Sequence, residues 1–260
     1  MMAESPRAAV RTPVAPLFAE PRVASAQISQ LVAGRVVQLL EERDDWYRVC
    51  GPDDYEGWLH RGYLVPLPAA SMRHSGQVPR ISLGCVTNDG NGGRRAMPLG
   101  ALLAPDERVT SGEVIDAAHI ARRFPLEPLA ITRSAQLYFE GTSYLWGGVT
   151  PWGADCSGIV QAVFSLHGLQ LRRDAWQQAE QGVPGHEDIM ASDTGDLLFF
   201  SDRVDAHITH VALALGGRRL VHLALGRGGY AIERLDDMRD AYVEKLRDRF
   251  VCARRVIGSV

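Results

Sequence analysis

The sequence lacks any hydrophobic segment long enough to cross a membrane. Its longest apolar stretches, such as Val211 to Leu215, are far shorter than the roughly 20 residues that a spanning helix needs. Near the N-terminus Pro6, Pro13 and Pro16 interrupt the apolar residues, and no small-residue cleavage site follows a hydrophobic core, so we predict no signal peptide. We therefore expect a cytoplasmic protein without a membrane span.

The chain also lacks an excess of charge of either sign. It has 28 Lys and Arg residues against 31 Asp and Glu residues, which gives a formal net charge of −3. A nearly balanced charge produces no long-range attraction to nucleic acid or to an anionic membrane. We expect neither as a partner, and no feature of the sequence indicates an obligate protein partner.

Paired cysteines are absent as well. The four cysteines, Cys50, Cys85, Cys156 and Cys252, lie so far apart that no CxxC pair exists, and a reducing compartment would keep them as thiols. No other group of ligand-type residues has the fixed spacing of a metal site, so we predict no metal and no cofactor. We expect Cys50, Cys85 and Cys252 to be small buried hydrophobic residues.

The composition that is present, with 46% hydrophobic and 23% charged residues, is that of an ordinary globular protein. Residues 30–66 alternate apolar and polar positions in short runs, and residues 78–123 repeat this style, which predicts short antiparallel strands. Segments with linker composition follow each stretch, at 66–71 and at 123–128. We therefore predict two small β-barrel-like domains followed by a third domain, over residues 1–67, 68–126 and 127–260.

The first of these domains carries a recognisable signature. The stretch GWLHRGYL after Asp54-Tyr55-Glu56 resembles the end of a bacterial SH3-type (SH3b) domain, although Asp54 stands where that family often has Gly. The positions that match are Trp46, Val49, Tyr55, Gly57 and Trp58. The second domain has no comparable signature, so its interpretation as SH3-like depends on position and pattern alone.

The third domain begins with patterns typical of helices and ends with patterns typical of strands. A helix is predicted over residues 131–139, and a second one starts at Cys156 behind the capping residue Asp155 and ends at Gly168. Three strands are predicted over residues 196–200, 209–215 and 219–224. Cys156 is therefore expected at a helix N-terminus.

A thiol at a helix N-terminus is a candidate nucleophile. The unpaired N–H groups and partial positive charge there lower the pKa of a cysteine, so we expect Cys156 to form a thiolate readily. His210 and His222 lie on predicted strands joined by a turn at Gly216-Gly217, which makes them neighbours in a hairpin. One can then act as general base while the other orients it. His207 competes for the role of base: on a strand it would face away from His210, and position alone does not decide between the two.

These residues also have plainer interpretations. An isolated cysteine with two histidines is more often structural than catalytic. Trp176 is better explained as a core aromatic residue, and the same is open for Trp146. The charges that alternate from Glu233 to Arg249 are typical of a solvated helix face. Residues 226–229, which are rich in glycine, predict a hairpin turn and not a phosphate loop, because the Lys-Ser/Thr of a P-loop is missing.

Six short sequence blocks, found in one order along the chain, favour a catalytic role for Cys156 and the two histidines. Residues 128–256 resemble the NlpC/P60 cysteine peptidases in these blocks: Tyr144–Gly148, Asp155–Gly158, Arg173–Gln178, Gly195–Phe200, His210–Ala212 and His222. The resemblance implies an α+β, papain-like catalytic domain, preceded here by the two small SH3-like β-barrel domains. It also implies that Cys156 is the nucleophile, that His210 and not His207 is the base, and that His222 is the third member.

With the SH3b-like modules in front, the chain resembles the subgroup that cleaves γ-D-glutamyl-diamino acid bonds in murein peptides. That likeness implies a groove lined by Tyr144, Trp146, Asp155 and Ser157 and closed at one end by a tyrosine of the first SH3b domain, for which Tyr55 is the candidate. Helix capping is an equally good role for Asp155.

The chain departs from the subgroup at one substrate-facing motif. The Arg-Asp-Ser sequence of the subgroup is Arg173-Asp174-Ala175 here, so an expected hydroxyl is missing, and Arg172 replaces a common Pro. Asp174 remains a candidate for binding the substrate's amine, with a solvated surface charge as the alternative.

We therefore expect a cysteine endopeptidase that trims freed cell-wall peptides for peptidoglycan recycling. Two other functions are compatible with the sequence. One is a wall-peptide-binding protein without turnover, and the other is an acyl- or amide-transfer enzyme with the same fold.

Overall fold

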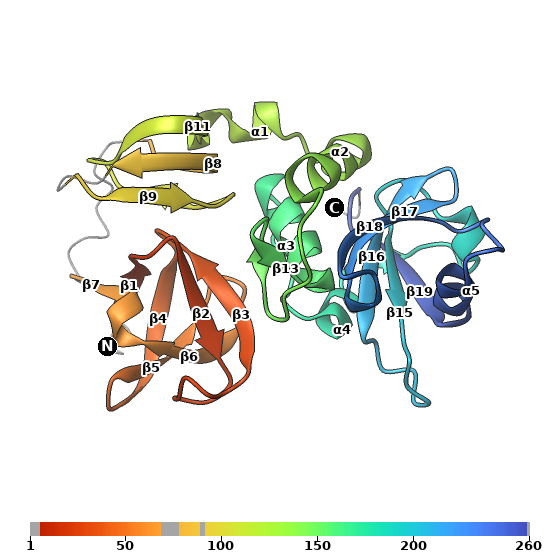
Figure 1. The fold of residues 1–260 in the computed structure, drawn as a ribbon, viewed down its shortest axis with the longest axis horizontal. Coiled ribbons are helices and arrows are strands. Elements are labelled where there is room, and N and C mark those ends of the chain that lie inside the picture. The colour runs from red at the N-terminus through yellow and green to blue at the C-terminus, as the bar shows by residue number, and fades with distance from the viewer. Residues whose placement is uncertain (1–5, 69–77, 89–91, 259–260) are drawn as a thin grey trace. The chain divides into compact units, whose positions relative to one another are not determined.

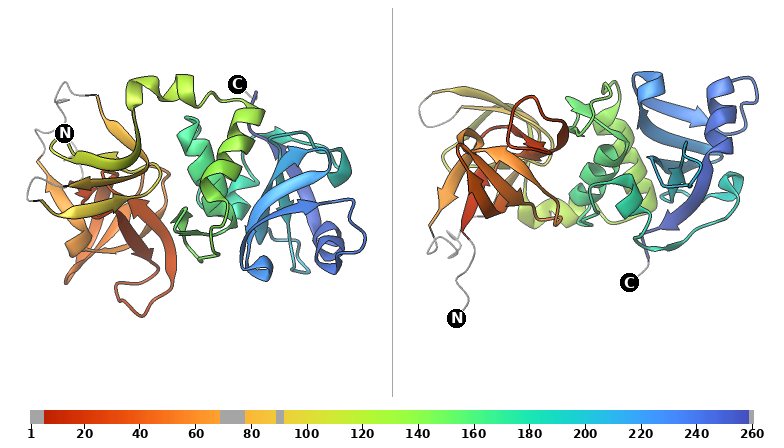
Figure 2. Two further views of the ribbon diagram at one scale, coloured as in Figure 1. Left: turned by 45° about the horizontal axis from the view of Figure 1, so that its top comes forward. Right: turned by 90° about the horizontal axis from the view of Figure 1, so that it is seen from below.

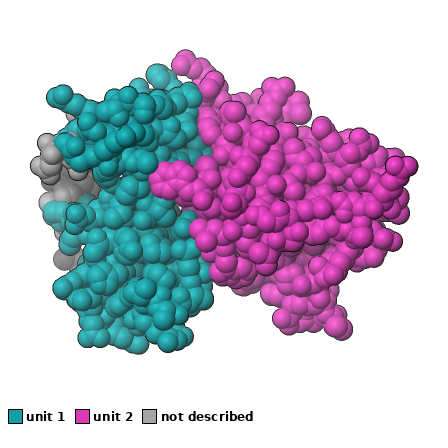
Figure 3. Space-filling model, in the orientation of Figure 1, with its two compact units in different colours: residues 1–120 teal, residues 121–260 magenta. Residues whose placement is uncertain are grey.

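A computed structural model of the chain describes residues 6–68, 78–88 and 92–258 and divides it into two units. Unit 1 is Met1–Ile120 and unit 2 is Ala121–Val260 (Figure 3). The expected boundary between residues 67 and 68 follows the last strand of the first sheet, and residues 69–71 of the expected linker lie outside the described residues. The finer division into three domains stays a prediction.

Unit 1 is built from antiparallel strands (Figure 1). Within residues 6–68, the strands pair in the order β3-β2-β6-β5-β4-β1-β7. Their bounds are β1 (Arg7–Val10), β2 (Val14–Phe18), β3 (Gln27–Val32), β4 (Val36–Arg43), β5 (Trp46–Cys50), β6 (Glu56–His60) and β7 (Leu64–Leu67). Alternate residues of β1 and β2 are buried, as expected for strands with one face on a core.

A second sheet follows in the described residues 78–88 and 92–116. Its strands are β8 (Arg80–Asn88), β9 (Arg94–Met97), β10 (Leu102–Leu103) and β11 (Arg108–Asp116), and β8 pairs with each of the others. Val32 and Ala33 of the first sheet's edge share a buried cluster with Cys85, Met97 and Leu103, so the two sheets have a common core.

Unit 2 places helices on both sides of a mixed-length antiparallel sheet (Figures 1 and 2). Among its described residues, the sheet order is β14-β19-β15-β16-β17-β18, with α2 and α3 side by side on one side and α5 on the other. The helices are α1 (Ile120–Arg123), α2 (Pro128–Phe139), α3 (Cys156–Leu166), α4 (Ala175–Gln178) and α5 (Ala241–Asp248). The strands are β12 (Val149–Thr150), β13 (Gly153–Ala154), β14 (Val183–Pro184), β15 (Leu197–Phe200), β16 (His210–Gly216), β17 (Arg219–Ala224), β18 (Gly229–Arg234) and β19 (Phe250–Arg255).

The elements expected around the cysteine are confirmed. Helix α3 begins at Cys156, and its apolar residues at Ile159, Val160, Val163 and Phe164 are all buried. Helix α2 begins three residues earlier than expected, at Pro128, because a proline is well tolerated in the first helical position. Strands β15, β16 and β17 match the three predicted strands, and β16 and β17 form the predicted antiparallel hairpin.

Two expectations for side chains in unit 2 are wrong. Glu233 does not lie on a solvated helix face: it belongs to β18 and is only 5% exposed, and α5 covers only Ala241–Asp248. Alternation along a strand, with Ile232 and Arg234 exposed on either side, buries Glu233. Trp176 is not a core residue, since 40% of it is exposed.

Across the described ranges, none of the helices combines the length and the apolar character needed to cross a membrane.

Candidate active site

Cys156 is the first residue of α3 and is almost completely buried. Burial raises the pKa of its thiol to about 12, with the charge of Asp155 acting in the same direction, against the opposing effects of the Val211 N–H, Arg173 and the Ser157 N–H. The expected lowering of this pKa is therefore wrong for the free protein, because the cost of burying a thiolate exceeds the gain from the helix N-terminus. A thiol with a raised pKa needs a base to remove its proton before it can act as a nucleophile.

His210 is the candidate base, at the start of the strand that reaches that thiol. It opens β16 and precedes Val211, whose N–H is hydrogen-bonded to the Cys156 sulfur. Burial, followed by the charges of His222 and Arg249, lowers the pKa of His210 to about 3. The unprotonated ring is the form that can accept a proton.

The second imidazole is where the hairpin predicted it. His210 Nε2 lies 2.9 Å from His222 Nδ1, and the two ring centroids are 5.0 Å apart at an interplanar angle of 70°. His222 is fully buried. Because Nε2 of His210 faces His222, the Nδ1 atom of His210 is left to face another group, as the proposed triad requires.

A buried carboxylate that the sequence interpretation missed lies behind His222. Glu233 Oε1 is 3.4 Å from His222 Nε2. Arg227 holds the same carboxylate with both ends of its fork, Nε to Oε1 at 2.7 Å and Nη2 to Oε2 at 3.0 Å, and also pairs with Asp240. The guanidinium group of Arg227 lies over the ring of Tyr242, 4.3 Å from its centroid.

The hairpin predicted at residues 226–229 contained the signal for this carboxylate. It joins β17 to β18 in a register that pairs His222 with Ala231 and Leu220 with Glu233. Residues two apart on adjacent strands share a face, so extending β18 from the predicted turn would have brought Glu233 beside His222.

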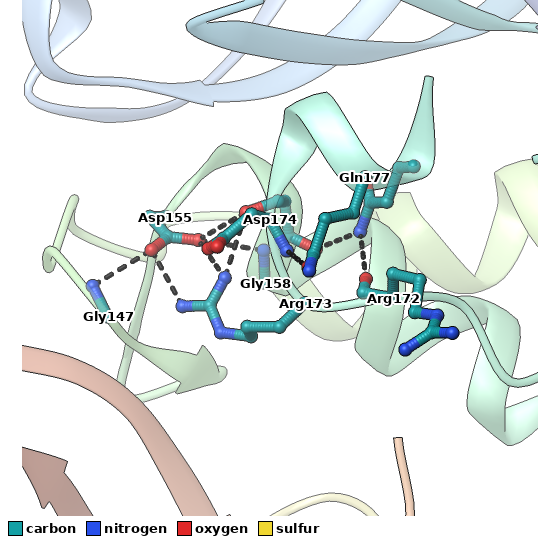
Figure 4. A network of polar contacts seen from close by, with 9 residues as sticks. Gly147, Asp155, Gly158, Arg172, Arg173, Asp174 and Gln177 are labelled. Carbon is teal, nitrogen blue, oxygen red and sulfur yellow. Dashed lines mark hydrogen bonds and ion pairs between the residues drawn. The ribbon is translucent and has the colours of Figure 1, made fainter. Parts of the chain in front are cut away.

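Asp155 and Ser157 are held in a network that surrounds the first turn of α3 (Figure 4). Arg173, only 1% exposed, donates from Nη2 to Asp155 Oδ2 at 2.7 Å, from Nη1 to Asp155 Oδ1 at 3.1 Å and from Nη1 to Ser157 Oγ at 2.8 Å. The carboxylate also accepts the N–H of Gly147 and the N–H of Gly158, each at 2.8 Å. The expected capping role of Asp155 is confirmed, and Arg173 holds both oxygens of the capping carboxylate.

The glycines of two motif blocks allow this close approach. A Cβ atom on Gly158 would lie 2.0 Å from the carbonyl oxygen of Gly148, and one on Gly148 would lie 2.3 Å from the carbonyl oxygen of Gly153. Backbone therefore rests directly on backbone where the loop before β12 meets α3, and only glycine fits there.

Tyr144 and Trp146 come from the same loop but differ in exposure. Tyr144 is half-buried, and its pKa is raised by burial and by the charge of Cys156. Trp146 is 65% exposed, so it is no core residue.

The remaining predicted site residues lie on other elements. Asp174 is the N-cap residue of α4, and its N–H donates to Gln177 Oε1 at 3.2 Å. Ala175, which replaces the expected serine, is the first residue of that helix and is buried. Tyr55 belongs to unit 1, where it packs partly buried against the core of the first sheet. A role for Tyr55 in the groove stays a prediction.

His207, the competing base, is not on a strand. It lies exposed in the segment before β16, with its ring 6.0 Å from that of Trp176. In the described part of the chain, no three His, Cys, Asp or Glu side chains are grouped as metal ligands. The grouped chemistry in unit 2 is a thiol, a neutral imidazole and the N–H groups of a helix start, which together suit nucleophilic attack on a carbonyl carbon.

Comparisons with protein families match both units. The NlpC/P60 family matches residues 141–254, and the family described as the bacterial dipeptidyl-peptidase Sh3 domain matches residues 17–64. The fold of the chain is accordingly papain-like with an SH3-type domain in front.

Individual relatives cover most of the chain. A gamma-D-glutamyl-L-lysine dipeptidyl-peptidase of Bacillus subtilis (strain 168) is 26% identical over 247 residues, covering 84% of this chain and 78% of that protein. Dipeptidyl-peptidase 6 of Lysinibacillus sphaericus is 27% identical over 269 residues, covering 90% and 93%. The crystal structure of an NlpC/P60 family protein from Bacillus cereus ATCC 10987 superposes with a TM-score of 0.80 over 97% of this chain and 100% of that one, at 17% identity. At that identity the likeness shows a shared fold.

Proposed function

Because residues 141–254 form an NlpC/P60 domain and residues 17–64 a bacterial SH3 domain, we propose that this chain is a cysteine peptidase that hydrolyses γ-D-glutamyl-diamino acid bonds in cell-wall peptides. One observation carries the proposal. Cys156 starts α3 beside the first residues of β16, where His210 is neutral and hydrogen-bonded to His222 at 2.9 Å. This is the arrangement that nucleophilic hydrolysis by a thiol requires.

The proposed reaction proceeds by acyl transfer. His210 Nδ1 takes the proton from the Cys156 sulfur, and the thiolate attacks the γ-glutamyl carbonyl carbon. N–H groups at the start of α3 stabilise the negative oxygen of the tetrahedral intermediate. The protonated His210 then gives its proton to the departing amine as the C–N bond breaks and a thioester remains. Water, deprotonated by His210, attacks the thioester, and the acid product and the free thiol are released.

Substrate preference is proposed from the relatives and from the groove residues. The Bacillus subtilis relative is named for a gamma-D-glutamyl-L-lysine bond, and we propose the same bond type for this chain, with the diamino acid to be determined. Tyr144, Trp146 and Asp174 are the proposed substrate-binding residues of unit 2, and the role of Tyr55 stays a prediction from the sequence. Asp155 and Ser157 contribute through the network with Arg173 that fixes the nucleophile's helix.

A direct assay tests the proposal. Purified protein is incubated with L-Ala-γ-D-Glu-diaminopimelate and with L-Ala-γ-D-Glu-L-Lys, and release of the L-Ala-D-Glu dipeptide is followed by chromatography. Cys156→Ala should abolish release, whereas the matched control Cys252→Ala, a half-buried thiol on β19, should keep it. Equal activity of Cys156→Ala and wild type would overturn the proposal, and saturable binding without release would support the peptide-binding alternative instead.

A role in peptidoglycan recycling and a cytoplasmic location are proposed as well, on the sequence expectations above. Fractionation of cells that express a tagged chain tests the location. Accumulation of short murein peptides in a strain without the gene tests the role.

A further inference from the structure

The chain of polar contacts in the active site does not end at the second histidine. His210, His222 and Glu233 are linked in sequence by contacts of 2.9 and 3.4 Å, and the last of them is clamped by Arg227. We propose that Glu233 is a positioning residue that selects the tautomer of His222 and thereby makes His210 a base. The inference rests on the proposed cysteine peptidase chemistry of Cys156 and His210.

The tautomer argument follows from what each atom can donate. A carboxylate accepts hydrogen bonds only, so His222 Nε2 must carry the hydrogen that faces Glu233. In a neutral ring the other nitrogen, Nδ1, then has a lone pair and accepts the hydrogen of His210 Nε2. His210 Nδ1 is left unprotonated and can take the thiol proton.

The opposite tautomer would disable the site. If His222 carried its hydrogen on Nδ1, it would donate to His210 Nε2, and a neutral His210 would then bear its hydrogen on Nδ1. That atom could not accept a proton from Cys156. Two histidines alone do not distinguish the two arrangements, whereas an ionised carboxylate behind His222 does.

Glu233 is held in the ionised form that this role needs. Burial acts to raise the pKa of its carboxyl group, but the hydrogen bonds from His222 and Arg227 outweigh burial and lower that pKa below its ordinary value. Proton transfer from Cys156 creates an imidazolium at His210, and the negative charge behind His222 stabilises it. The other charged and titratable groups around the two rings are Arg227, Asp240, Tyr242 and Arg249.

The closing experiment uses two variants whose effects on the base should be opposite in sign. Glu233→Gln removes a negative charge from behind His222, so we expect kcat to fall roughly 10- to 100-fold with KM changed less than about twofold. The acid limb of the kcat/KM profile should move to lower pH, because the imidazolium is less stable. Arg227→Gln removes a positive charge, so its acid limb should move to higher pH. General loosening of the fold cannot produce opposite shifts.

A matched control and substrate-free measurements complete the test. Glu244→Gln makes the same chemical change on the exposed face of α5 and should alter neither rate nor profile. The rate of alkylation of Cys156 by iodoacetamide at neutral pH should fall in Glu233→Gln, while that of Cys252 is unchanged. The ¹⁵N shifts of the wild-type rings should show His222 protonated on Nε2 alone.

These measurements separate the inference from the proposed function. Alkylation and ring shifts need no peptide, so they decide the role of Glu233 even if neither murein peptide is cleaved. An unchanged acid limb and alkylation rate in Glu233→Gln, or a wild-type His222 protonated on Nδ1, would overturn the inference while leaving peptide hydrolysis intact. If Glu233→Gln does not fold, the direction of the Arg227→Gln shift decides.

Discussion

Two buried carboxylates, each held by an arginine, flank the reacting groups, and they differ in how they are enclosed. Asp155 and Arg173 are both almost fully buried, and the carboxylate also accepts backbone N–H groups at the start of α3 (Figure 4). Glu233 is equally buried, but the side chain of its partner Arg227 is 30% exposed and shared with Asp240.

The difference assigns different work to the two sides of the site. On the nucleophile side, the Asp155–Arg173 pair contacts backbone N–H groups, so it fixes the position of α3, which begins with Cys156. On the base side, the Glu233–Arg227 pair contacts the imidazole of His222, so it sets which nitrogens of the two imidazoles carry protons. Because Arg227 is partly exposed to solvent, the Glu233–Arg227 ion pair is only partly desolvated. The Asp155–Arg173 pair is fully desolvated, because Arg173 is buried.

The largest expected effect tests that contrast in stability. Arg173→Met strands the Asp155 carboxylate in the interior, so we expect the free energy of unfolding to fall by about 3–5 kcal/mol. Arg227→Met leaves Glu233 bonded to His222 and removes a partner whose own side chain is partly exposed, so we expect a smaller loss of about 1–2 kcal/mol. Urea unfolding followed by circular dichroism measures both. Equal losses in the two variants would break the comparison.

The next effect tests the rigidity of the nucleophile side alone. In Gly158→Ala the new methyl group must displace the carbonyl of Gly148, 2.0 Å away, at a cost of about 1–3 kcal/mol. Because Cys156 is two residues away on the same turn, kcat should fall together with stability. Ser165→Ala, at a half-buried position of the same helix, is the control and should change neither. Full activity in Gly158→Ala would show that the first turn of α3 need not be fixed.

The same contrast explains how far the sequence could predict this site. Local patterns sufficed for α3, its Asp155 cap and the hairpin that joins His210 to His222, since each depends on spacing within a short segment. The bond between Arg173 and Asp155 joins residues 18 apart that lie on either side of α3, and no periodicity indicates it.

Burial was the quantity that the sequence could not supply. The alternating charges from Glu233 to Arg249 predict a solvated helix face, although the structure buries Glu233 on β18. The position of Cys156 at a helix start predicts a low pKa, but desolvation by the surrounding elements of unit 2 dominates and raises it. Both errors have the same cause: contacts made by distant segments override a local pattern.

A smaller effect tests whether the base side is the one that responds to pH. The pKa of His210 is lowered by burial to about 3 in the folded protein, against about 6.5 in an unfolded chain. Between these two pH values, the unfolded state therefore binds a proton at His210 that the folded state does not bind. Stability from this source is complete above pH 6.5 and is lost as pH falls towards 3, by at most about 1.4 kcal/mol per pH unit.

The measurement compares wild type with His210→Gln, a neutral side chain at the same position. Urea midpoints between pH 7 and pH 4.5 should fall more steeply in wild type than in His210→Gln. Parallel curves would show that His210 is not held neutral and that the base side does not respond to pH in this way.

The smallest expected effect lies at the outer end of the base side. Asp240 pairs with Arg227 and caps α5 by accepting the N–H of Tyr242 at 2.8 Å. Asp240→Asn keeps a good capping residue and removes one charge from a partly exposed pair, so the free energy of unfolding should fall only slightly, by less than in any variant above. Arg227 still holds Glu233 through both oxygens, so kcat should stay within about twofold of wild type. A loss of activity as large as that expected for Glu233→Gln would mean that the charge of Asp240 affects the imidazoles through Arg227. The Glu233–Arg227 pair would then be as fully desolvated as the Asp155–Arg173 pair.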